Sequence, residues 1–144
     1  MALTLGMTFC HVMEIPGKLR LGGAAWLTVQ HNLYFAFGVV GAAIELLSIL
    51  LTWVVVFLVR RRPAFFWTLG AALCVTAGLV GWFLMVAPMN AALSGWTAET
   101  LPADWTSYRN QWEAGHAMHA AFFGLGFSAL VVALLAETRK SPSR

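Results

Sequence analysis

The chain has 144 residues, of which 60% are hydrophobic and only 10% are charged, and its mean hydropathy is +0.75. So little polar surface cannot cover a water-soluble globule, which excludes an ordinary soluble domain and predicts one integral-membrane domain over residues 1–144, with the lipid bilayer as its partner. The net charge of +3 comes mostly from basic residues at the edges of apolar runs, so we attribute it to membrane topology and expect no nucleic-acid partner.

Four helices are predicted, over residues 2–14, 26–59, 64–90 and 103–137. Apolar runs at 33–59, 64–88 and 116–136 each supply the ~20 residues that a hydrocarbon core requires, and in lipid they must be helical. The first segment is shorter, because a helix of 13 residues rises only about 20 Å. Pro102 and the tryptophans after it predict a short interfacial helix before the last span. The expected fold is therefore all-α, a transmembrane four-helix bundle with a short first helix and an interfacial helix before the last span.

Basic residues predict the orientation of this bundle. Those that we expect in the cytoplasm are Arg60, Arg61 and Arg62 between the second and third helices, and Arg139, Lys140 and Arg144 in the tail. Lys18 and Arg20 lie on the opposite side and are outnumbered. By the excess of basic residues in cytoplasmic loops, the protein is predicted to be a multi-pass protein of the plasma (inner) membrane with both termini in the cytoplasm.

Small residues follow one face of the third helix. Gly70, Cys74 and Gly78 recur at four-residue spacing, which is typical of a seam where two membrane helices pack closely. The second cysteine, Cys10, lies in a different apolar segment, and we expect both cysteines to behave as small hydrophobic side chains.

Polar residues gather at the outer end of every predicted helix. They are His11 and Glu14 in the first, Gln30 and His31 in the second, Asn90 in the third, and Glu113, His116 and His119 in the fourth. Counting a rise of ~1.5 Å per residue from the cytoplasmic ends places Glu45 about 21 Å and His119 about 26 Å up the bundle, within a turn of each other. We therefore expect Glu45 to face the interior, protonated or hydrogen-bonded, because a carboxylate turned to lipid is costly.

The spacing of these residues is compatible with a metal or haem site. His11 and Glu14 form an H-x-x-E pair, and Glu113, His116 and His119 form E-x-x-H-x-x-H, so that each set lies on one helical face. Bundles that bind two metals use such pairs on facing helices. The candidate ligands are His11, Glu14, His116, His119 and Glu113, for a transition metal or a haem. The supporting residues are Asn90, Gln30, His31, Arg109, Trp112 and Glu45.

Three functions remain open at this point. The cluster could be the centre of an oxidoreductase whose hydrophobic small-molecule substrate enters from lipid. It could be a proton path in a small transporter, although no strongly discontinuous span is predicted. It could instead pin the bundle together through hydrogen bonds, and a single histidine at the interface, such as His31, is more often an anchor of that kind.

The strings HVMEIPGKLRL, WLTVQHNLY, APMN and LPADWTSYRNQWEAGHA are similar to a family of small bacterial four-helix integral-membrane proteins related to the anthrone oxygenases. The resemblance covers most of the chain. It implies roles for His11, Glu14, Pro16, Gln30, Asn90, Arg109, Trp112, Glu113 and His116. The chain departs from the family at His31, where glutamine is more frequent, and in its shorter first helix. Anthrone oxygenases insert oxygen into an activated aromatic carbon, and a shared fold does not by itself carry that reaction across.

Overall fold

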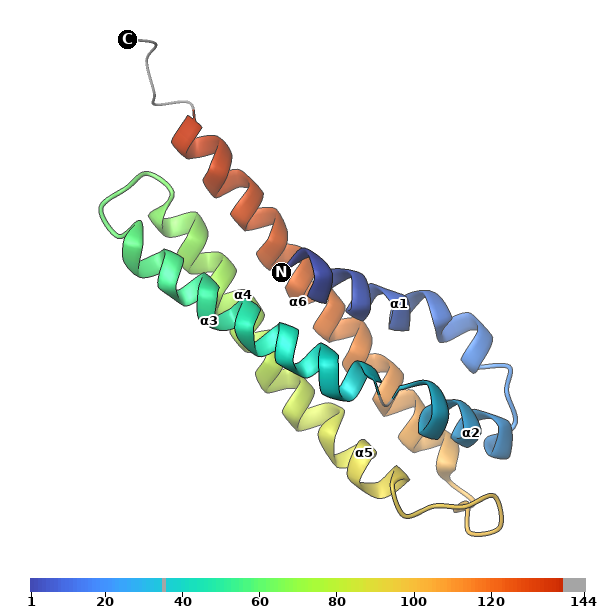
Figure 1. Cartoon of the computed structure of the whole chain (residues 1–144). Coiled ribbons are helices and arrows are strands. Elements are labelled where there is room, and N and C mark those ends of the chain that lie inside the picture. The colour runs from blue at the N-terminus through green and yellow to red at the C-terminus, as the bar shows by residue number, and fades with distance from the viewer. Residues whose placement is uncertain (35, 139–144) are drawn as a thin grey trace.

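The computed structural model describes residues 1–34 and 36–138, so Arg139, Lys140 and Arg144 of the orientation argument lie outside it. Its elements are α1 (Ala2–Lys18), α2 (Gly23–Leu33), a π-helix η1 (Phe37–Gly41), α3 (Ala42–Leu58), α4 (Phe65–Met85), α5 (Ala87–Leu93) and α6 (Trp105–Thr138). The described residues contain no strand, which confirms the all-α prediction (Figure 1).

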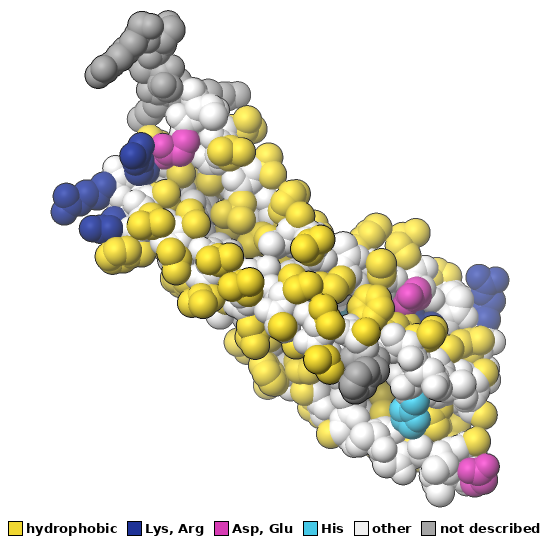
Figure 2. Space-filling view, viewed as in Figure 1, with side chains coloured by type: hydrophobic (Ala, Val, Ile, Leu, Met, Phe, Trp, Pro, Cys, Tyr) yellow, Lys and Arg dark blue, Asp and Glu magenta, His cyan; other side chains and the backbone are white. Residues whose placement is uncertain are grey.

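Three stretches are long and apolar enough to cross a membrane: Phe37–Leu58, Phe65–Leu93 and Trp105–Thr138. Their outer faces carry large exposed hydrophobic side chains, such as Leu50, Phe66 and Leu134, which lipid would cover. Hydrophobic side chains spread over the middle of the molecule, whereas the basic ones gather toward its ends (Figure 2). The structure therefore agrees with a membrane protein.

The first helix, α1, packs against α6 and begins beside the middle of α3 (Figure 1). The amino group of Met1 donates a hydrogen bond to Ser48 Oγ at 3.0 Å, and Thr4 Oγ1 lies 3.2 Å from the same oxygen. With 17 residues α1 is longer than predicted, but it is not among the three membrane-crossing stretches. The four-helix transmembrane bundle thus stays a prediction, while the structure has three stretches that are long and apolar enough to cross a membrane and one shorter packed helix.

The predicted single helix over 26–59 is interrupted. Helix α2 ends at Leu33, and Tyr34, the residue after it, is not helical. The π-helix η1 then begins at Phe37 and continues directly into α3. Two physical causes favour the break here: Gly38 and Gly41 are weak helix formers, and the Tyr34 hydroxyl donates a 2.6 Å hydrogen bond to Glu14 Oε2. The prediction of one continuous helix over 26–59 was therefore wrong at this point, while Phe37–Leu58 remains long and apolar enough to cross a membrane.

Two other predicted helix boundaries differ from those in the structure. The third helix bends at Val86, where α4 gives way to the short α5, because Pro88 cannot donate a backbone hydrogen bond within a helix. The separate interfacial helix before the last span is not observed, since α6 runs without interruption for 34 residues from Trp105. Its first turns already carry the aromatic residues that had indicated an interface.

The closest helix contact joins α4 to α6. A Cβ atom added to Gly78 would lie 3.1 Å from Phe122 Cβ, and one added to Gly126 would lie 2.8 Å from Val75 Cγ1. Cys74 Cβ faces Gly126 at 3.6 Å, so Gly78 and Cys74 belong to the predicted seam. Gly70 does not, because nothing lies within 4 Å of its added Cβ. This tight contact fixes the α6 histidines relative to α4.

The core at the end of the molecule predicted to face outward is aromatic and aliphatic. Trp26 and Leu27 of α2 pack with Val86, Leu93 and Trp112, and all are almost fully buried. This group, called here the outer cap, ties α2 and α5 to α6. It lies at the end of the molecule opposite Arg60–Arg62 (Figure 1).

Candidate functional site: a pocket among four histidines

A pocket with a volume of about 430 Å³ lies between α1, the η1–α3 segment, α4–α5 and α6. Its wall is mostly apolar and aromatic, with Tyr34, Phe37, Trp82, Phe83 and Trp112 as its large rings. All histidines of the chain contribute to it, namely His11, His31, His116 and His119. This size and lining are typical of sites that hold a small molecule.

The predicted approach of α1 and α6 is observed at His11 and His116. Their ring centroids lie 4.3 Å apart with planes inclined by 36°, and both side chains are buried. Trp112 packs against both rings, at 5.3 Å from His11 and 4.1 Å from His116. The predicted convergence of these two histidines is therefore confirmed.

Both ring nitrogens of His116 are buried and lack a hydrogen-bond partner among the described residues. The same holds for Nδ1 of His11, Nδ1 of His119 and Nε2 of Gln30, all in residues that line the pocket. A buried polar atom without a partner costs about 1–3 kcal/mol. Several of them around one pocket indicate a place that water or a polar ligand completes.

Glu45 and His119 form the polar contact at the deeper part of the pocket wall. His119 Nε2 lies 3.0 Å from Glu45 Oε1, and the two side chains are 3% and 12% exposed. The ring of His119 fits against Gly78, whose added Cβ would lie 3.2 Å from His119 Cδ2. The prediction that Glu45 turns inward and meets His119 is confirmed.

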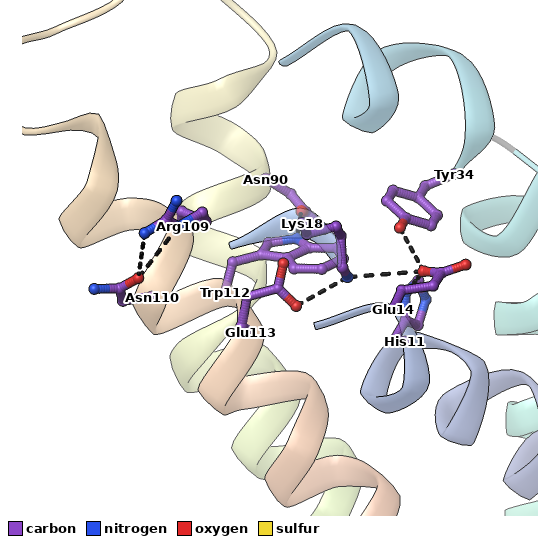
Figure 3. A network of polar contacts seen from close by, with 9 residues as sticks. All are labelled: His11, Glu14, Lys18, Tyr34, Asn90, Arg109, Asn110, Trp112 and Glu113. Carbon is purple, nitrogen blue, oxygen red and sulfur yellow. Dashed lines mark hydrogen bonds and ion pairs between the residues drawn. The ribbon is translucent and has the colours of Figure 1, made fainter. Parts of the chain in front are cut away.

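A second polar network lies outside the pocket wall, around Lys18. Its ammonium lies 2.9 Å from Glu113 Oε2 and 3.7 Å from Glu14 Oε2, and it stands 4.5 Å above the Trp112 ring (Figure 3). Lys18 and Glu113 are almost completely buried, whereas the side chain of Glu14 is 42% exposed. Both candidate carboxylates of this region are thus paired with a lysine.

Glu14 also connects α1 to the break before η1. It lies 3.7 Å from Nδ1 of His11 and accepts the hydrogen bond of Tyr34. Burial raises the pKa of the Tyr34 phenol, and the hydrogen bond to Glu14 acts in the same direction, so the hydroxyl stays a donor. Burial lowers the pKa of the His11 imidazole to about 4, with Lys18 acting in the same sense and Glu14 against it. His11 is therefore neutral at pH 7.

The supporting residues divide into two groups. Asn90 Oδ1 accepts a 2.8 Å hydrogen bond from Trp112 Nε1, and His31 Nε2 lies 3.0 Å from the Leu93 carbonyl oxygen. These two residues and Gln30 line the pocket. Arg109 does not line it. Its guanidinium contacts Asn110 Oδ1 and the Leu19 carbonyl and stands 5.0 Å from the Trp105 ring.

The metal prediction finds no support in this arrangement. Within residues 1–34 and 36–138, no group of three or more His, Cys, Asp or Glu side chains is placed to hold a metal ion. Lys18 occupies the position between the carboxylates that a cation would need. A haem between His11 and His116 does not fit either, because two bonds near 2 Å on opposite faces of one iron require the rings to stand farther apart than they do.

Sequence reasoning missed Lys18 and Tyr34 as members of the site. Lys18 was treated only as a charge in the orientation argument. Its spacing of four residues from Glu14 and seven from His11 places all of them on one helical face, and that signal was available. Tyr34 could not be placed, because its position depends on the unpredicted break after α2.

Comparisons of the chain with protein-family models, with curated proteins and with solved structures found no match. What the chain does has to be argued from the pocket itself.

Proposed function

We propose that this protein is a membrane-embedded protein of the oxidoreductase class that binds a lipid-soluble aromatic molecule carrying a polar oxygen in the central pocket. The aromatic wall favours a flat hydrophobic body, and the histidines favour a hydroxyl or carbonyl group on it.

One observation carries the proposal: His116 is buried in the pocket wall with neither ring nitrogen paired. An imidazole can donate through one nitrogen and accept through the other, so a ligand oxygen can satisfy it. Neighbouring unpaired atoms on His11, His119 and Gln30 extend this polar wall over three helices. A role limited to holding the bundle together does not account for them, because such a role would pair the atoms with one another.

The binding test uses 1-naphthol and naphthalene, which differ by one hydroxyl. Binding is followed by quenching of tryptophan fluorescence in nanodiscs, since Trp82 and Trp112 line the pocket. We expect 1-naphthol to bind about 3- to 10-fold more tightly, the preference that one net hydrogen bond gives. His116→Phe keeps a flat ring and should remove the preference. Ser128→Ala, whose hydroxyl donates to Gly124 O away from the pocket, should keep it. Equal binding of both probes to the wild type contradicts the proposal.

The reaction type rests on the resemblance to the relatives of anthrone oxygenases. The corresponding reaction consumes anthrone and dioxygen and yields anthraquinone and water. We expect dioxygen uptake with anthrone to exceed the rate of its spontaneous oxidation in empty nanodiscs, and His116→Phe to reduce it to that rate. Binding of 1-naphthol without any such uptake would leave a binding protein and reject the oxygenase reaction.

A more specific version of this proposal adds a metal ion or a haem to the pocket. The rings of His11 and His116 lie too close to bind opposite faces of one iron, and the pairing of Glu14 and Glu113 with Lys18 weighs against another metal. Elemental analysis and absorbance of detergent-purified protein, beside His11→Ala and His116→Ala, decide the matter. Stoichiometric metal or a Soret band that both variants lose would establish the centre.

A proton-coupled transporter is the second candidate, and the break between α2 and α3 favours it. Discontinuous helices build the substrate sites of many transporters, and Glu45, which pairs with His119 of α6, lies in the span that follows the break. In sealed proteoliposomes, a transporter would move protons when a solute gradient is applied. An enzyme would leave the internal pH unchanged.

A further inference from the structure

We propose that the pocket is entered sideways from the lipid, through a mouth between the small residues Gly38 and Ala42 on one side and Phe83 on the other, and that Gly38 limits the size of the molecules that pass. This inference rests on the proposed function, because it names the route to the same pocket.

The mouth is defined by exposed residues that also line the pocket. Gly38, Ala42 and Leu46 follow one another at four-residue spacing along η1 and α3, and Phe83 of α4 lines the facing wall. Leu46 is 56% exposed and Phe83 is 59% exposed. All four residues lie within membrane-crossing stretches, so the medium outside this mouth is lipid.

Buried residues obstruct part of the route from water. The outer cap places Trp26, Leu27, Leu93 and Trp112 at the aqueous end with at most 4% exposure. His31 Nε2 lies 3.0 Å from the Leu93 carbonyl oxygen between α2 and α5, and His31, Asn90 and Ser94, which line the pocket at this end, are exposed. A lipid-soluble molecule therefore meets exposed polar residues beside the outer cap on the water side, and small apolar residues on the membrane side.

Gly38 can test this idea because its replacement should not disturb the fold. No atom lies within 4 Å of a Cβ added at this position, and its φ is not positive. The Cβ atom of a leucine there has open space beside the mouth, and leucine is a better helix former than glycine. Gly70 of α4 has the same open surroundings and does not line the pocket, so Gly70→Leu is the matched control.

The first experiment measures association and dissociation rates of 1-naphthol by stopped-flow tryptophan quenching in nanodiscs. We expect Gly38→Leu to slow both rates by about tenfold, the effect of a barrier raised by ~1.4 kcal/mol, with a nearly unchanged dissociation constant. Phe83→Ala should accelerate both, and Gly70→Leu should match the wild type. Unchanged association and dissociation rates in Gly38→Leu would contradict entry through the proposed mouth. Absence of 1-naphthol binding to the wild type would instead reject the proposed ligand class.

The second experiment needs no ligand and decides the route by itself. Leu79→Cys, in the half-buried pocket wall, is combined with Cys10→Ser and Cys74→Ala and reacted in nanodiscs with lipid-soluble pyrene maleimide or a sulfonated maleimide. We expect the lipid-soluble reagent to react at least about tenfold faster, and Gly38→Leu to slow it. Leu50→Cys, exposed on the outer face of α3, should react alike with and without Gly38→Leu. Equal rates with both reagents at Leu79→Cys would show a pocket open to water and overturn the proposal.

Discussion

Single residues at the outer end of this protein carry charge where little water reaches them. Lys18 is 4% exposed and lies between a buried carboxylate, Glu113, and a half-exposed one, Glu14, with an aromatic ring beneath its ammonium. Taking a lysine and a glutamate out of water costs several kcal/mol per ion unless they remain paired. The Lys18–Glu113 pair is therefore a fixed connection between α1 and α6.

The first prediction follows from this pair. Lys18→Met leaves the Glu113 carboxylate buried without its cation and should lower the free energy of unfolding by about 3–5 kcal/mol. Adding Glu113→Gln removes the stranded charge, so the double variant should lose less than the two single variants together. Thermal unfolding in detergent, followed by circular dichroism, measures these differences. Arg20→Met, on an exposed side chain, is the control. Additive losses would mean that the two residues are not coupled.

The second prediction concerns the Glu45–His119 contact in the wall of the pocket. Glu45→Leu leaves Nε2 of His119 buried without a partner and should cost about 1–3 kcal/mol of unfolding free energy. Glu45→Gln keeps an oxygen at the same position and should cost less. The same unfolding assay compares the two variants. Equal stability of both would show that the contact contributes nothing to the fold.

At the scale of the elements, the α4–α6 seam holds the pocket wall in place, because His119 lies against Gly78 and the α6 helix approaches α4 through glycines. The third prediction tests the seam. Gly126→Ala puts a methyl group 2.8 Å from Val75 Cγ1 and 3.2 Å from the Ala71 carbonyl oxygen, so it should destabilise the protein by about 1–3 kcal/mol through overpacking.

Gly124 is the matched control for this change, two residues away on the same helix. The nearest atom to its added Cβ is Leu5 Cδ1 at 3.9 Å, so Gly124→Ala should be neutral or slightly stabilising. A similar loss of thermal stability in both variants would assign the effect to helix α6 itself rather than to the seam.

The elements also explain which features the sequence could predict. The rise per residue of a helix is fixed, so counting from the cytoplasmic ends correctly brought Glu45 to His119 across a separation of 74 residues. Helix continuity was not predictable in the same way. Gly38 and Gly41 weaken the helix without determining where it breaks, and the hydrogen bond of Tyr34 at the break is made to a different helix.

The same distinction applies to the site. Depth and helical face predicted that His11 and His116 approach one another, and they do. They could not predict that Glu14 and Glu113 would turn toward Lys18, because the choice between a lysine and a metal depends on side-chain rotamers. Spacing fixes where a Cβ atom lies and leaves the direction of a long side chain open.

At the scale of the whole molecule, charge is distributed unequally between the two ends. Arg60, Arg61 and Arg62 lie together between α3 and α4, and within residues 1–34 and 36–138 Glu137 pairs with Arg62 alone, at 3.6 Å. At the other end Lys18 is neutralised by Glu113 within the fold, which leaves Arg20 and Arg109 as the basic side chains near the surface. Basic residues direct the orientation when the chain inserts, before this pair forms, so Lys18 still counts against the predicted orientation.

The last prediction is this orientation, with the α3–α4 link in the cytoplasm and the α5–α6 link outside. Loops that are rich in arginine are retained on the cytoplasmic side, and the described residues place two unpaired arginines, Arg60 and Arg61, in one short link. In intact cells that produce a variant with Cys10→Ser and Cys74→Ala, a membrane-impermeant maleimide should label Ser94→Cys, which is exposed at the end of α5. It should label Arg61→Cys only after the membrane is opened. The reverse pattern would place the pocket in the cytoplasmic leaflet, and the excess of arginine in this link would then not determine how the protein inserts.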